Sequence, residues 1–225
     1  MLHSFKFQKI ALATASLLAI GSYQASAQDA TINISGQITA STCGLSVADT
    51  GNAAASGSNS KNILLGNYTP TQSQVGNNAG TTFGNEKRVV FSLTNGTQGG
   101  SPGGCLISTN GKWDVSLGLS SNSVSTIGGK TFLRNSSTAT GFTDAVVLLK
   151  SGVVSDLNTQ ATASLNELTL VDAAGLGGNY LGGGFTASSG SSIVLSAQFA
   201  NSKPGNVSAT AGIFSQSIPL TIVYK

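Results

Sequence analysis

Ser101 is the residue whose surroundings come nearest to those of a catalytic nucleophile. Residues 99–103, GGSPG, fit the G-x-S-x-G pattern of a hydrolase nucleophile elbow, in which a sharp strand-to-helix turn exposes the serine. That elbow uses the backbone N–H after the serine to bind the oxyanion, and Pro102 has no N–H. The only histidine, His3, lies in a segment that we expect to be removed, so no imidazole base remains for a serine triad. We interpret residues 99–103 as a glycine-rich loop.

Two other segments hold fragments of nucleotide-binding motifs. Residues 128–131, GGKT, match the end of a P-loop, but the first glycine of G-x-x-x-x-G-K-[ST] would fall at Val124. The glycines of residues 175–184 do not satisfy G-x-G-x-x-G. Four carboxylates could include an acid–base pair, although solvated loop and strand-end positions are the simpler interpretation: Asp144, Asp156, Glu167 and Asp172. We therefore expect no enzyme activity, no cofactor and no metal site.

The composition indicates a β protein with many turns. The 225 residues include 29 glycines, and only 8% of them are charged while 40% are hydrophobic. With no long helical periodicity, this composition predicts an all-β chain, and the length suits one domain with a sizeable core. The formal net charge is +3 and falls to about +1 without Lys6 and Lys9. No basic patch or aromatic series indicates nucleic-acid binding.

Residues 1–27 have the pattern of a secretory signal peptide. Lys6 and Lys9 form a positive start, residues 10–20 form an apolar stretch, and residues 25–27, ASA, form a small-residue cleavage site before Gln28. The apolar stretch is well short of the roughly 20 residues that a membrane-spanning helix needs. We expect the mature chain to be exported.

Export determines how the two cysteines are interpreted. In an oxidising compartment, Cys43 and Cys105 are expected to form a disulfide. Two cysteines without a nearby histidine make a poor zinc site, because zinc takes four ligands, or three and a water. Closing a loop of about 60 residues would contribute roughly 4 kcal/mol in the chain-entropy treatment.

The two ends of the mature chain have the clearest β patterns. From Gly212 to Lys225, every second residue belongs to one set: Phe214, Gln216, Ile218, Leu220, Ile222 and Tyr224. From Thr31 to Thr39, one face would carry Ile32, Ile34, Gly36 and Ile38. Alternation over these lengths predicts strands with one buried face.

Between these ends the sequence predicts several short strands, with a single Trp113 interpreted as a core residue. The expected strands cover Ile63–Gly66, Val89–Leu93, Val115–Leu119, Ala145–Leu149, Leu165–Val171 and Ser192–Phe199. Residues 94–104 are expected to form a loop insertion, tolerated because loop-closure entropy grows slowly with length. Residues 175–190 are expected to form a loop or a frayed hairpin.

Together the two ends resemble the pilins, the subunits of chaperone–usher fimbriae, and in particular the type 1 pilus major-subunit-like family. That family ends in a strand with a penultimate tyrosine, here Tyr224, and with a glycine at the fourteenth position from the end, here Gly212. It begins with an alternating apolar extension around one glycine, here Gly36. The resemblance implies an incomplete Ig-like β-sandwich, residues 41–225, preceded by a donor-strand extension, residues 28–40. It also agrees with a disulfide between Cys43 and Cys105.

The resemblance further implies a structural, non-enzymatic role at the bacterial cell surface, in a fimbrium that supports cell adhesion. A periplasmic chaperone lends the missing strand, and an outer-membrane usher mediates assembly. The extension of one subunit, through Ile32, Ile34, Gly36 and Ile38, then fills a groove beside the last strand of its neighbour by β-augmentation. In a single isolated chain, the extension is expected either to dangle or to fold back into its own groove. Ile218, Leu220, Ile222 and Tyr224 are expected to face the interior or that groove.

Two alternatives have different functions. A tip adhesin of the same system normally carries an added lectin domain and lacks a donor extension, whereas this chain has the extension and a length that allows one domain. A secreted enzyme is disfavoured by the absence of a mature histidine and of any intact motif. The sequence does not indicate whether the subunit is major or minor.

Overall fold

The structure is a computed structural model, and it describes the chain in separate stretches. These are residues 30–36, 43–49, 60–69, 73, 78–95, 97–98, 101–102, 112–154, 162–171, 179–182, 185–186, 191–205 and 207–224. Most of these residues lie in β-strands, so the all-β prediction is confirmed. Across the same stretches, no helix has the length and apolar character to cross a membrane.

The first sheet, sheet A, contains both terminal strands. Its order is β12 (Asn179–Tyr180), β7 (Lys112–Leu117), β15 (Ser215–Tyr224), β1 (Ala30–Gly36) and β3 (Ser60–Gly66), and β13 (Phe185–Thr186) also pairs with β7. β15 is thus an internal strand between β7 and β1. In the 175–190 region, for which a loop or a frayed hairpin was expected, the described residues include two short strands at the edge of this sheet.

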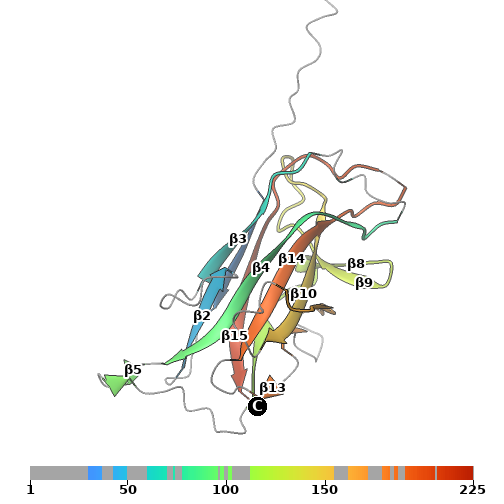
Figure 1. Ribbon diagram of the computed structural model, residues 1–225. Helices are drawn as coiled ribbons and strands as arrows, with labels where there is room; N and C mark the ends of the chain where they lie inside the picture. The colour runs from blue at the N-terminus through green and yellow to red at the C-terminus, as the bar shows by residue number, and fades with distance from the viewer. Residues whose placement is uncertain are drawn as a thin grey trace, which may run out of the picture.

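The second sheet, sheet B, lies in front of β15 in the view of Figure 1. Its order is β2 (Cys43–Asp49), β4 (Thr82–Asn95), β14 (Ser192–Ala200), β10 (Val146–Val154), β9 (Lys130–Leu133) and β8 (Val124–Ile127), with β11 (Asn166–Glu167) also paired to β10. A short 3-10 turn, η2 (Ser121–Ser123), precedes β8. Part of the expected loop at 94–104 is a two-stranded ladder, β5 (Thr97–Gln98) with β6 (Ser101–Pro102).

One apolar core lies between the two sheets. It combines inward-facing residues of sheet A, such as Trp113, with inward-facing residues of sheet B, such as Phe91 and Ile193, and all three are fully buried. Burying a large apolar side chain stabilises the fold by about 1.5–3 kcal/mol, so this shared cluster holds the sheets together. The prediction that Trp113 is a core residue is confirmed.

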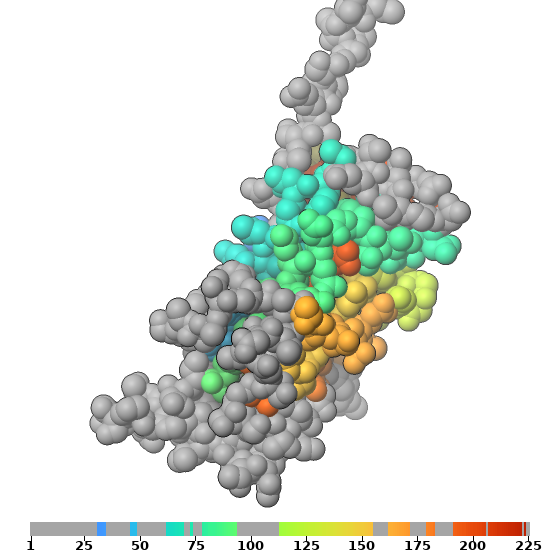
Figure 2. Space-filling view, viewed as in Figure 1, coloured from blue at the N-terminus to red at the C-terminus, as the bar shows by residue number. Residues whose placement is uncertain are grey.

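The outer face of sheet B is covered by the protein itself. Leu165 and Ala163 pack on Val90, Val154 and Val194 and form a small second core there. Figure 2 looks onto this side, where residues of the 163–170 stretch, in orange, lie against β4 in green and β10 in yellow. A Cβ at Gly152 would lie 2.9 Å from the backbone oxygen of Ser164, so glycine is needed for this close approach.

The β8–β9 hairpin was not expected from the sequence. Its turn consists of Gly128 and Gly129, which have φ angles of +57° and +80°. Two successive residues with positive φ are typical of the type I′ turn, whose twist matches that of the flanking strands. The glycine pair that resembled a P-loop fragment therefore has a conformational role.

Candidate functional site

β1 occupies the position between β3 and β15, so the first and last of the described strands lie side by side. It runs parallel to β15, with Thr31 beside Ser215 and Gly36 beside Leu220. It runs antiparallel to β3, with Ile32 beside Ile63. Of the two expected arrangements for a single chain, the structure has the folded-back one.

The inward face of β1 is fully apolar where its side chains are described. Ile32 and Ile34 are both 0% exposed, whereas Asn33 between them is exposed. Gly36 lies within the strand, and Ile38 lies outside the described residues. The predicted alternation is thus confirmed for the first two isoleucines, and burial of each stabilises the fold by about 1.5–3 kcal/mol.

β15 continues the buried face of sheet A beside β1. Ile218 and Leu220 are buried, and Ser217, Pro219 and Thr221 are exposed, as the sequence predicted. Ile222 and Tyr224 belong to the strand, but their side chains lie outside the described part of the structure. Phe214 and Gln216 are also buried and continue the same inward face.

Gln216 is an unusual residue for this buried position. Its Nε2 donates hydrogen bonds to Ser123 Oγ at 3.1 Å and to the backbone oxygen of Ser217 at 3.2 Å. Its Oε1 is buried and has no partner among the described residues. Exchanging the two amide atoms would place Oε1 against the Ser217 oxygen, so one atom of this amide is unsatisfied in either orientation.

Pro219 has no N–H, although it lies in β15, a strand that is paired on both sides. The N–H of Gly118 donates to the Pro219 oxygen at 2.8 Å, which shows that the backbone of Pro219 faces β7 rather than β1. The regular β7 ladder begins only at the next pair, Leu220 with Leu117. The missing donor therefore falls just beyond the end of that ladder, where a proline is tolerated.

Gly212 sits where the chain enters β15, against the backbone of another loop. A Cβ at this position would lie 2.5 Å from the carbonyl carbon of Phe142 and 2.6 Å from the nitrogen of Thr143. The neighbouring Ile213 exchanges backbone hydrogen bonds with this loop, donating to Gly141 and accepting from Thr143. Gly212 is thus required by close approach of two backbones.

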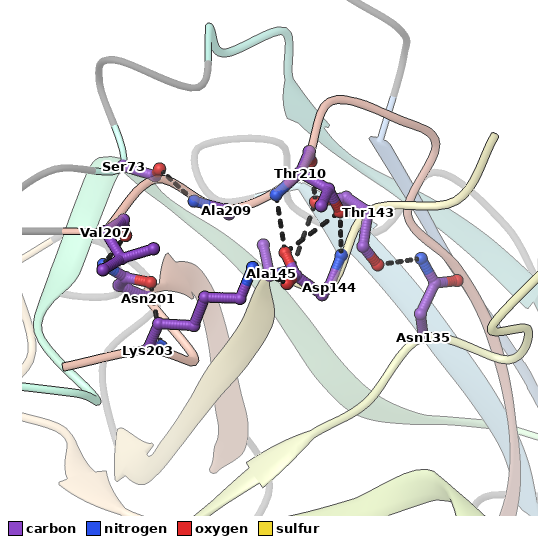
Figure 3. A network of polar contacts seen from close by, with 10 residues as sticks. All are labelled: Ser73, Asn135, Thr143, Asp144, Ala145, Asn201, Lys203, Val207, Ala209 and Thr210. Carbon is purple, nitrogen blue, oxygen red and sulfur yellow. Dashed lines mark hydrogen bonds and ion pairs between the residues drawn. The ribbon is translucent and has the colours of Figure 1, made fainter. Parts of the chain in front are cut away.

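Asp144 is the centre of a polar network that holds this loop to the segment before β15 (Figure 3). Its Oδ1 accepts from the amide of Thr210 at 2.6 Å, and its Oδ2 forms an ion pair with Lys203 Nζ at 2.5 Å. Thr143 donates through Oγ1 to the Thr210 oxygen at 2.6 Å. Asn135 Nδ2 donates to the oxygens of Thr143 and Ile213 at 3.0 and 2.6 Å.

The interpretation of Asp144 as a loop or strand-end residue is confirmed, because it lies just before β10 and its side chain is 35% exposed, but its contacts were not predicted. Burial alone would raise the pKa of Asp144, but hydrogen bonds from Lys203 and Thr210 outweigh burial and hold this pKa below its usual value. The contacts join positions 66 residues apart, so nothing local in the sequence indicated them. The network fixes where β15 starts and hence the register that β15 offers to β1.

An aromatic cluster closes the same end of the core. Tyr68 packs edge-on against Phe199, and Phe199 stacks on Phe83 at 5.5 Å between ring centroids. Gly84, with a φ of +69°, leaves room for the Tyr68 ring, which a Cβ would approach to 2.3 Å. A cavity of about 30 Å³ lies beside this cluster, lined also by Thr143 and Gly212. It has room for about two waters, far less than a metabolite site needs.

The remaining predicted site residues are the cysteines. Cys43 begins β2, opposite Asn95 of β4, and Cys105 lies outside the described residues. Among the side chains that the structure describes, no group of three or more His, Cys, Asp or Glu residues could hold a metal ion. No protein-family model matches the chain, and no curated protein matches it in sequence.

Proposed function

We propose that this protein is a structural subunit of a chaperone–usher fimbria and that it polymerises by donor-strand exchange. In this proposal the domain is an incomplete Ig-like sandwich, and residues 28–40 are its donor extension. The observation that supports it best is the position of β1: the strand beside β15 comes from the far end of the chain and buries Ile32 and Ile34 there. The same strand of a second copy would present identical side chains to the same groove.

Exchange between copies keeps both the apolar contacts and the backbone ladder. A strand entering beside β15 would gain main-chain hydrogen bonds and bury alternate side chains, as in other cases of β-augmentation. A strand from a second copy could also enter in the direction opposite to that of β1. It would then be antiparallel to β15 and parallel to β3, so the number of parallel neighbours would not change. Insertion of β1 in either direction therefore keeps one parallel and one antiparallel neighbour.

Competition from the strand on the same chain explains why assembly would need a chaperone and an usher. A strand on the same chain has an effective concentration of about millimolar, so a dilute subunit should remain closed on itself. A periplasmic chaperone that lends a strand would hold the groove open after export. An outer-membrane usher would bring subunits together at the cell surface, where the fibre supports adhesion.

Replacing Ile34 with Asp tests the proposal, with Asn33→Asp as the control. Ile34 is fully buried and Asn33 is exposed on the same strand, so only the first change places a carboxylate in the groove. An unpaired buried carboxylate costs several kcal/mol, comparable to or greater than the apolar contact that it replaces. Each variant is expressed with the chaperone, and periplasmic subunit and surface fibres are measured.

We expect Ile34→Asp to give normal subunit levels in complex with the chaperone but no fibres. Asn33→Asp should give both subunit and fibres. Normal fibres from Ile34→Asp would refute the donor-strand role. Loss of the subunit even with chaperone present would mean that β1 is a permanent part of its own domain.

A further inference from the structure

β15 is paired with different strands along its two halves. β1 pairs with residues 215–220 and β7 pairs with residues 220–224, so the two ladders meet at Leu220. Among the described strands, none pairs with residues 215–219 on the side away from β1. Buried backbone carbonyls need hydrogen-bond donors, so the contacts on that side decide whether this half of β15 keeps its conformation without β1.

The backbone carbonyls on the side away from β1 all accept from donors outside β1. Four alternate residues are involved, and their oxygens accept, in chain order, from the side-chain amide of Asn135 at 2.6 Å, the backbone amide of Ser136 at 2.9 Å, the side-chain amide of Gln216 at 3.2 Å and the backbone amide of Gly118 at 2.8 Å: Ile213, Ser215, Ser217 and Pro219. The oxygen of Phe214 between them accepts from the amide of Thr31 and therefore faces β1. One side of this half thus depends on β1, and the other side does not.

Asn135, in the connection between β9 and β10, acts like a residue of a neighbouring strand. Its Nδ2 donates to the Ile213 oxygen at 2.6 Å, and its Oδ1 accepts from the amide of Ser215 at 3.1 Å. A residue of a parallel neighbour likewise donates to one residue and accepts from the residue two positions later. The orientation of the side-chain amide is fixed, because the oxygens of Ile213 and Thr143 can only accept and the Ser215 N–H can only donate. Asn135 therefore takes the place of a strand partner at the start of β15.

Gln216 and Gly118 continue this support as far as the β7 ladder. The side chain of Gln216 donates to the oxygen of the next residue, Ser217, and also to Ser123 Oγ, which ties it to the turn before β8. Gly118 donates to Pro219 directly before the β7 ladder begins, and a Cβ at Gly118 would lie 3.3 Å from Pro219 Cβ. The buried amide of Gln216 is thus explained by the strand carbonyl to which it donates.

We infer that β15 is a preorganised edge: it keeps its strand conformation when β1 leaves, and Asn135 is the residue that positions its first half. Phe214 adds to this hold, because it is 0% exposed and packs edge-on against Phe199 with ring centroids 5.7 Å apart. A strand that binds an edge already in its bound conformation avoids the cost of ordering that edge, so it binds more tightly. The inference rests on the proposed function, because donor-strand exchange supplies the strand that would occupy the edge.

Amide hydrogen exchange of the mature wild-type chain, followed by NMR at low urea concentrations, tests whether β15 opens together with β1. Three amides bond on the side of β15 away from β1, those of Ser215, Ser136 and Gly118. The amide of Thr31, which donates to the Phe214 oxygen, reports on β1. We expect the Thr31 amide to exchange at least about tenfold faster than the other three, because β1 opens while β15 stays in place. Equal rates, or slower exchange at Thr31, would show that β15 does not outlast β1 and would overturn the inference.

Asn135→Ala tests the positioning role, with Asn166→Ala as the control because Asn166 is exposed on β11 of sheet B. Asn135→Ala should speed exchange of the Ser215 and Ser136 amides at least about tenfold and leave the amides of the β7 ladder unchanged. A general loss of stability would speed all of these amides alike. Asn166→Ala should change none of them. Unchanged exchange at Ser215 in Asn135→Ala, or an equal rise at every amide, would overturn the role of Asn135.

Asn135→Ser is a second variant in case Asn135→Ala does not fold. Its shorter side chain cannot bridge Ile213 and Ser215 at once, so the same selective rise is expected at Ser215 and Ser136. Exchange at Ser215 that stays at the wild-type rate in Asn135→Ser would likewise overturn the role of Asn135.

Failure of this inference can be distinguished from failure of the proposed function. Hydrogen exchange reports on the single chain, whereas the fibre counts for Ile34→Asp and Asn33→Asp report on assembly. Fibres that depend on Ile34, together with equal exchange at Thr31 and Ser215, would retain donor-strand exchange and exclude a preorganised edge. Slow exchange at Ser215 with fibres that do not depend on Ile34 would do the opposite.

Discussion

Gly212 shows at the scale of one residue how the start of β15 depends on backbone atoms far away in sequence. Gly212 drew attention because the resemblance places a glycine at the fourteenth position from the end. Its physical role is set by the backbone of Phe142 and Thr143. Pro219 is similar, because the ladder register alone explains why its missing N–H is harmless. Neither role follows from the local pattern of residues.

Replacing Gly212 with Ala should destabilise the protein by about 2 kcal/mol or more, because two backbone segments would have to separate. Gly205→Ala is the control: this glycine also has a positive φ, of +76°, but a Cβ there meets nothing within 4 Å. It should cost only about 1 kcal/mol through backbone strain. Urea unfolding of both variants measures the difference, and equal losses would show that close approach at Gly212 is unimportant.

At the scale of elements, the start of β15 is set by the Asp144 network rather than by the strand itself. Lys203 and Thr210 lie between β14 and β15, and Asp144 precedes β10, so the network ties strands of the two sheets together. Asn135 adds a further link by accepting from the amide of Ser215 at 3.1 Å. Loss of this network should weaken the pairing between the start of β15 and the start of β1.

Replacing Asp144 with Asn should make the stability of the protein change less with pH in the acid range. The pKa of Asp144 is lowered in the folded state, so its contribution is present above the unfolded pKa and is lost as pH falls through the folded pKa. Unfolding midpoints between about pH 5 and pH 3 should therefore fall less steeply in Asp144→Asn, and also in Lys203→Met, than in wild type. Asp144 is about a third exposed, so its share is no more than about 1 kcal/mol. An unchanged slope in both variants would contradict this role.

The sequence predicted elements well where alternation was long and poorly where glycines dominated. The alternation of Ile32 and Ile34, and of Ile218 and Leu220, gave the correct buried faces because the period of a strand is two. The direction of β1 relative to β15 could not be predicted, because alternation is the same in both directions. The β8–β9 hairpin was not predicted, because a Gly-Gly pair before Lys-Thr fits a phosphate-binding fragment as well as the two positive φ angles of a tight turn.

At the scale of the whole molecule, β1 completes sheet A from within the same chain. Asn33 of β1 lies opposite Asn62 of β3 in an antiparallel pair, and both residues are exposed. Opposed residues in such a pair have Cα atoms about 4.5–5.5 Å apart, which is within reach of a disulfide. The closed chain can therefore be locked covalently.

If the protein forms fibres by the proposed donor-strand exchange, the double variant Asn33→Cys/Asn62→Cys should remain a folded monomer and form none, because β1 could no longer leave its own sheet. Asn33→Cys alone should assemble like wild type. Surface fibres are counted by electron microscopy, and mass spectrometry verifies the new disulfide. Normal fibre numbers from fully oxidised double variant would show that assembly does not require release of β1.

The pairing of Thr31 with Ser215 also has a consequence for timing. Among the described strands, β1 is the first in the sequence and β15 the last, so the pairing of these two strands must wait until β15 has been synthesised. Contacts between such distant segments slow folding, because the intervening chain must be ordered first. From the synthesis of β15 until β1 inserts, the position beside β15 is vacant. During this time β1 competes with any other strand within reach for the position beside β15.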